Sequence, residues 1–190
     1  MQKLEEKFLF LVVLGGRANK ANIELHDVRW VVGSKIEDTY NVLRSDWFGS
    51  MQGLHIDSYK KIKYVDGYKI NLKNCEKDKK LVNLKKLQKQ LWFINIGGYN
   101  PFSMQEKHEF GLVVASSSLE AINIAKSKWL IGFQKKHKDD IDSLEILIDC
   151  DDCKPIRKVG SWEIELIKDH HFIQENNYPD WYGYQKLEGK

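Results

Sequence analysis

Two stretches of this 190-residue chain carry nearly the same pattern of side chains, and this internal repeat constrains the fold more than any other feature. Shifting the sequence by 82 positions places residues 9–57 on residues 91–139 without a gap, and 14 of these 49 positions are identical. Ordinary composition would give roughly three identities by chance. Farther along, the offset grows to 94, where residues 65–72 resemble residues 159–166. We therefore expect two homologous units, with 12 additional residues in the second.

Each copy predicts the same order of elements. An apolar run that ends in two glycines, residues 8–14 and 91–96, indicates a buried strand. The strand after it alternates, so that one face carries His26, Val28, Trp30 and Val32 in the first copy and His108, Phe110, Leu112 and Val114 in the second. A capping box then opens a helix, with Ser34 and Glu37 in the first copy and Ser117 and Glu120 in the second, one position out of register. A hairpin closes each copy.

The predicted fold is therefore α+β. It has two tandem β-β-α-β-β units related by a pseudo-twofold axis, with antiparallel sheets and one main helix in each unit. The expected boundaries are a first repeat unit at 1–72, a lysine-rich linker at 73–90, a second repeat unit at 91–167 with a hairpin insertion at 149–158, and a loop-like C-terminal extension at 168–190.

Composition limits the cellular compartment and the kinds of partner that we expect for this chain. The longest apolar run has seven residues, against the roughly 20 that cross a bilayer, so we expect no membrane partner. The chain has three cysteines, an odd number that is too small for a disulfide framework, and this favours a cytoplasmic protein. The net charge is only +3, and the lysines of residues 73–90 are interspersed with acids. We therefore expect a protein or small-molecule partner in preference to nucleic acid.

Several short patterns together resemble a known family. They are the strand that ends in Gly-Gly, the Glu-x-His-[Asp/Glu] step, the tryptophan at the helix end, the His-x-Asp before the hairpin, the string His137-Lys138-Asp139-Asp140, and the Asp-x-x-Gly-Tyr of Asp180–Tyr184. The chain resembles the bacterial family called domain of unknown function 1543, whose domain occurs in one or two copies per chain. The resemblance covers nearly the whole chain and implies a bacterial origin, but no activity. The second copy departs from it with Gly160-Ser161-Trp162 in place of Asp-Gly-Tyr at 66–68, so the two hairpins need not do the same job.

Repeated His-x-Asp triplets are the strongest candidates for chemistry. They are His55 with Asp57 and His137 with Asp139. In an extended segment, residues i and i+2 share a face, so the imidazole and the carboxylate would converge. Such a pair could bind a divalent metal, or the carboxylate could orient the imidazole as a general base. The alternative is structural, with the aspartate capping the loop and the histidine packing beside the preceding tryptophan.

His26 and His108 form a second candidate set, because each follows a glutamate by two residues at the start of a strand. A hydrogen-bonded histidine at the edge of the core is the simpler explanation of each. If His26 approached His55, however, the histidines and acids of one unit would form an oxygen–nitrogen metal site. The sequence thus names His26, His55, Asp57, His108, His137 and Asp139 as candidate ligands of a divalent metal.

Other patterns carry less information about function. The paired glycines are not followed by any phosphate-binding fingerprint, so a bulge or a close strand crossing explains them. Cys150-Asp151-Asp152-Cys153 lacks further ligands at zinc-site spacing, and we interpret it as an acidic hairpin loop.

Two classes of function remain. In the first, which the absence of a recognisable catalytic motif favours, the duplicated domain is a binding or interaction module whose aromatic C-terminal stretch docks a partner. In the second, it is a metal- or small-ligand-binding enzyme that uses the repeated histidines and acids. An interaction module predicts that these groups are dispersed, or buried with satisfied hydrogen bonds.

Overall fold

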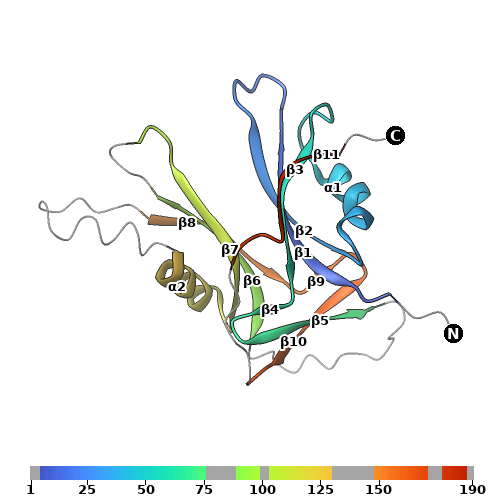
Figure 1. The fold of residues 1–190 in the computed structure, drawn as a ribbon. Helices are drawn as coiled ribbons and strands as arrows, with labels where there is room; N and C mark the ends of the chain where they lie inside the picture. The colour runs from blue at the N-terminus through green and yellow to red at the C-terminus, as the bar shows by residue number, and fades with distance from the viewer. Residues whose placement is uncertain (1–4, 76–88, 99–102, 130–147, 171–176, 188–190) are drawn as a thin grey trace, which may run out of the picture. The chain divides into compact units, whose positions relative to one another are not determined.

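The computed structural model describes residues 5–75, 89–98, 103–129, 148–170 and 177–187. The chain forms two compact units (Figure 1). Unit 1 contains Met1–Lys79 and Lys158–Lys190, and unit 2 contains Lys80–Arg157. Residues that we assigned to the second repeat are thus divided between the two units, since those after Arg157 cluster with the first repeat.

The main sheet of unit 1 is antiparallel, with the strand order β11-β3-β1-β2. Its strands are β1 (Phe8–Gly16), β2 (Leu25–Gly33), β3 (His55–Ile62) and β11 (Trp181–Lys186). The apolar run of β1 lies at the centre, as its buried character predicts. Phe10, Val12 and Leu14 on one face of β1 pack in a core with Ile36 of the 3-10 helix η1 (Ile36–Thr39) and Leu43 of α1 (Tyr40–Asp46).

A second sheet joins the hairpins of the two repeats. Its order is β4-β5-β10-β9, from β4 (Tyr64–Val65), β5 (Tyr68–Asn74), β9 (Lys158–Val159) and β10 (Trp162–Lys168). The register of β5 and β10 places Asn71 opposite Glu165, two positions that the offset of 94 equates, and the Asn71 amide donates a 2.7 Å hydrogen bond to the Glu165 carboxylate. The hairpin of each repeat therefore gains its partner strand from the other repeat.

Unit 2 has a three-stranded antiparallel sheet of order β7-β6-β8, from β6 (Gln90–Gly98), β7 (Lys107–Ala115) and β8 (Ile148–Ile156). Helix α2 (Ser118–Trp129) packs along it, with Ala121 and Ala125 against Ile94, Ile96 and Val113 (Figure 1). Small alanines let the helix approach the sheet closely. In the described part of the chain, no helix is long and apolar enough to cross a membrane.

The structure confirms an α+β fold, with antiparallel sheets and two α-helices among the described residues. It differs from the sequence prediction at three places. Most of the expected hairpin insertion, 149–158, lies inside strand β8, and the expected C-terminal loop contains strand β11, which pairs with β3. The expected linker, 73–90, is shorter than predicted, because β5 extends to Asn74 and β6 begins at Gln90. Linker residues 76–88 lie outside the described part.

The 3-10 helix η1 and helix α2 have equivalent acids in their first turns. The Asp38 carboxylate accepts a hydrogen bond from the Ser34 amide, and the Glu120 carboxylate accepts one from the Ser116 amide. The offset of 82 equates these pairs, so the capping box predicted for Ser34 with Glu37 is wrong by one residue. The capping residues of the two repeats are therefore in register, and not displaced by one position as the sequence analysis inferred.

Glu120 makes the start of α2 sensitive to acid. Hydrogen bonds from Lys89 and Ser116 lower the pKa of Glu120 from 4.5 to about 2. A carboxyl group whose pKa is depressed in the folded state contributes stability above its unfolded pKa and loses it as the pH falls toward the folded value. We expect Glu120→Gln to lower the melting temperature near pH 7, with the difference from the wild type shrinking between pH 4.5 and pH 2. Thermal unfolding across this range tests the expectation, and a difference independent of pH would contradict it.

Candidate metal centre

A glycine on each central strand makes room for a group of polar side chains. Leu14 faces the helix-covered core, so its neighbour Gly15 faces the opposite side of the sheet. The register places His26 on one side of Gly15 and His55 on the other. A Cβ atom on Gly15 would lie 2.5 Å from Nε2 of His55, which means that glycine is required for the imidazole to lie there.

Gly97 occupies the same place in unit 2. His108 lies opposite it on β7, and Asp149 lies opposite it on β8. A Cβ atom on Gly97 would overlap the Glu106 carboxylate and lie 2.9 Å from Oδ2 of Asp151. The first glycine of each pair, Gly15 or Gly97, thus provides space for these side chains, a role that the sequence analysis did not assign to it.

Each sheet has a β-bulge at an aspartate. The β1–β3 register shifts so that Leu14 pairs with Ile56 and Val13 with Ser58, which leaves Asp57 as the extra residue. The β6–β8 register shifts in the same way and leaves Asp151 as the extra residue. Because a bulge re-aims the side chain of its extra residue, both carboxylates can turn toward the histidine on the other side of the central strand.

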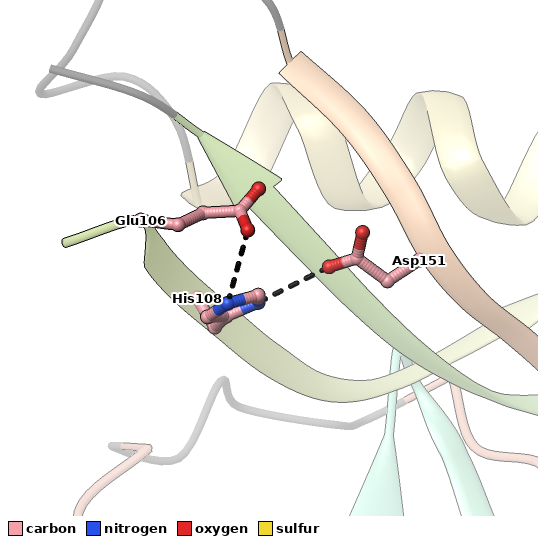
Figure 2. Close-up of side chains that lie close together, drawn as sticks. All are labelled: Glu106, His108 and Asp151. Carbon is pink, nitrogen blue, oxygen red and sulfur yellow. Dashed lines mark hydrogen bonds and ion pairs between the residues drawn. The ribbon is translucent and has the colours of Figure 1, made fainter.

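In unit 2, three potential ligands meet on the sheet face (Figure 2). Nε2 of His108 lies 3.5 Å from Oε2 of Glu106, and its Nδ1 lies 3.1 Å from Oδ2 of Asp151. One ligand atom from each residue lies within 4.8 Å of the other two. Helix α2 lies behind the sheet in this view, and about half of the His108 side chain is exposed, so the cluster is open to solvent.

The number of protons on the His108 ring determines whether its contacts with the two carboxylates are attractive. A neutral imidazole has one N–H donor, and an ionised carboxylate can only accept. Since both ring nitrogens of His108 face carboxylates, a neutral ring would direct a lone pair at one of them. A second proton on the ring or a bound cation removes this repulsion. Carboxylate oxygens and an imidazole nitrogen are the ligand atoms that divalent metals take from proteins.

Unit 1 has four groups connected by pairwise contacts, from Glu24 through His55 and Asp57 to His26. Asp57 bridges two imidazoles, with Oδ1 at 3.0 Å from Nε2 of His55 and Oδ2 at 3.2 Å from Nε2 of His26. Oε1 of Glu24 lies 3.6 Å from Nε2 of His55. Within the described residues, only the unit 2 set has three ligand atoms all within 4.8 Å of one another, so a cation in unit 1 would have to replace the direct contacts of Asp57.

The structure places the candidates from the sequence unequally. It brings His26, His55 and Asp57 together in unit 1 and places His108 in the unit 2 cluster. His137 and Asp139 lie outside the described residues. The strand register equates Asp57 with Asp151, which the sequence analysis assigned to an insertion. The sequence offset of 94, applied to Asp57, leads to Asp151 and could have identified it as the equivalent residue.

Cys150 and Cys153 lie in strand β8, which corrects their assignment to a hairpin loop. Both are partly buried and pack against the apolar core beneath α2. Burial raises the pKa of the Cys153 thiol. A thiol with a raised pKa carries less of the thiolate form that reacts or binds metals, which fits a packing role for Cys153.

Comparison with known proteins gives a family and a related structure. The family model described as Domain of Unknown Function (DUF1543) matches residues 21–72 and 103–166, in two segments that fit two tandem copies. A crystal structure of protein Il1583 from Idiomarina loihiensis is 32% identical, with a TM-score of 0.69, over 97% of this chain and 100% of that one. No curated protein matches the chain.

The neighbouring glycines Gly97 and Gly98 give a matched test of the site geometry. We expect Gly97→Ala to separate Glu106 and Asp151 from His108 and to leave the fold intact, because the atoms that its Cβ would meet are the ends of flexible side chains. Gly98→Ala should change neither, since nothing lies within 4 Å of its Cβ position. NMR of the His108 ring, with thermal unfolding, measures both effects. An unchanged His108 signal in Gly97→Ala would contradict the proposed packing.

Proposed function

This chain belongs to the family of domain of unknown function 1543, and we propose that it binds divalent metal ions at the side chains that meet over its central glycines. The observation that carries the proposal is the convergence of Glu106, His108 and Asp151 within 4.8 Å. Two carboxylates and an imidazole give an oxygen-rich site with three protein ligands. Such a set leaves coordination positions for water or a substrate, as catalytic metal sites do.

The second site lies in unit 1, at Glu24, His26, His55 and Asp57. Its support is positional, because the strand registers equate His26 with His108 and Asp57 with Asp151, and the offset of 82 equates Glu24 with Glu106. A metal here replaces the direct contacts between Asp57 and the two imidazoles. Each repeat then contributes one site of its own.

An interaction module remains the second candidate function. It predicts that the histidines and acids are dispersed, or buried with satisfied hydrogen bonds, and His55 fits the second description because it is buried with both ring nitrogens paired. The grouping of Glu106, His108 and Asp151 on the open face over Gly97 argues for metal binding instead. The observation that favours docking is a set of exposed tyrosines near the C-terminus, with exposed fractions of 75% for Tyr178, 78% for Tyr182 and 58% for Tyr184. A protein partner that docks on the C-terminal segment would contact these rings.

Metal titration of tag-free, chelator-treated protein tests the proposal. We expect Mn²⁺ and Zn²⁺ to bind in a defined stoichiometry, detected by calorimetry and by elemental analysis after dialysis. A metal at 100 times its Kd should add about 2.7 kcal/mol of stability, which shifts the melting temperature by several degrees. If neither metal binds or shifts the melting temperature, the proposal fails, and the exposed tyrosines become the leading surface.

Single substitutions assign the sites. Asp57→Asn and Asp151→Asn should each remove one equivalent of metal, because each removes a carboxylate from one cluster. Asp152→Asn is the matched control, since its side chain pairs with Lys154 at 2.7 Å and is not part of the cluster. Equal metal loss in the control would show that general surface acidity, and not the clusters, holds the metal.

A further inference from the structure

The two clusters differ at a single register position. His55 lies opposite Gly15 in unit 1, whereas Asp149 lies opposite Gly97 in unit 2. The other three positions keep the same residue types: Glu24 and Glu106, His26 and His108, Asp57 and Asp151. Among the described residues, unit 1 therefore has two imidazoles at its cluster where unit 2 has one.

The ring of His55 is held in one orientation. Its Nδ1 lies 2.8 Å from the carbonyl oxygen of Gly53, and since a carbonyl can only accept, Nδ1 carries a proton. This leaves Nε2 directed at the carboxylates of Asp57 and Glu24. A carbonyl that accepts from one ring nitrogen fixes the tautomer and makes the other nitrogen a better metal ligand.

The same imidazole is also shielded from water. His55 is 1% exposed, and the ring of Tyr184 from strand β11 stacks on it with a centroid distance of 3.9 Å. The equivalent histidines of the two units, His26 and His108, have side chains that are 54% and 46% exposed. Unit 1 thus adds a shielded and oriented imidazole to an exposed one.

We propose that the two units discriminate between metals, with unit 1 selecting a nitrogen-preferring ion such as Zn²⁺ and unit 2 accepting a harder ion such as Mn²⁺. The inference rests on the proposed function, because it assigns a class of metal to the same clusters. Imidazole nitrogens suit Zn²⁺, while carboxylates and water suit Mn²⁺ and Mg²⁺. Since Zn²⁺ exceeds Mn²⁺ in affinity at most protein sites, the quantity that discriminates is the Zn²⁺-to-Mn²⁺ affinity ratio of each unit.

Variants with one intact cluster measure the two ratios separately. Asp151→Asn leaves unit 1 and Asp57→Asn leaves unit 2, and each is titrated with Zn²⁺ and with Mn²⁺ alone against a chromophoric chelator. We expect the Zn²⁺-to-Mn²⁺ ratio of unit 1 to exceed that of unit 2 by about tenfold, the low end of the effect that ligand surroundings have on metal affinity. Equal ratios would overturn the inference and leave metal binding itself intact.

Exchanging the residue types at positions 55 and 149 tests whether this difference causes the difference between the two ratios. In the Asp57→Asn background, Asp149→His should raise the ratio of unit 2 toward that of unit 1. In the Asp151→Asn background, His55→Asp should lower the ratio of unit 1. Because His55 is buried, a folding defect could accompany the second exchange, and Asp149→His then decides the question. A ratio that does not move with Asp149→His overturns the inference, whereas the absence of all metal binding overturns the proposed function as well.

Discussion

The space above one glycine on each central strand allows polar side chains of the neighbouring strands to meet on one face of the sheet. A central strand has neighbours on both sides, so the side chains opposite its residues meet across it on one face. At Gly15 and Gly97, the missing Cβ lets those side chains converge above the strand. A Cβ atom at either position would overlap these side chains and push them apart.

The bulged aspartates complete the arrangement that the glycines permit. A regular strand would direct successive side chains to opposite faces, whereas the extra residue at Asp57 or Asp151 brings a carboxylate to the histidine across the sheet. Carboxylates grouped around an imidazole repel one another and the ring lone pair unless a cation or a proton lies between them. A cation bound among Glu106, His108 and Asp151 would offset this repulsion, which is the physical basis of the metal proposal.

The sequence predicted the fold class well, because its strands and helices have strong local patterns. The buried run at Phe8–Gly16 and its copy at Gln90–Gly98 both form central strands. It could not place Asp151, since a bulge depends on pairing with a distant strand and leaves little local pattern. Likewise, β10 pairs with β5 of the other repeat, a choice of partner that alternation within β10 does not encode. Nor could the sequence bring His26 to His55, which meet only because β1 pairs with both of their strands.

The central claim is that a metal lies among Glu106, His108 and Asp151. Anomalous diffraction from a crystal grown with Mn²⁺, collected on both sides of the manganese absorption edge, tests it most directly. The account predicts an anomalous peak within coordination distance of an oxygen of Glu106, a ring nitrogen of His108 and an oxygen of Asp151. Peaks only at other surface carboxylates, with this cluster keeping its direct contacts, would contradict it.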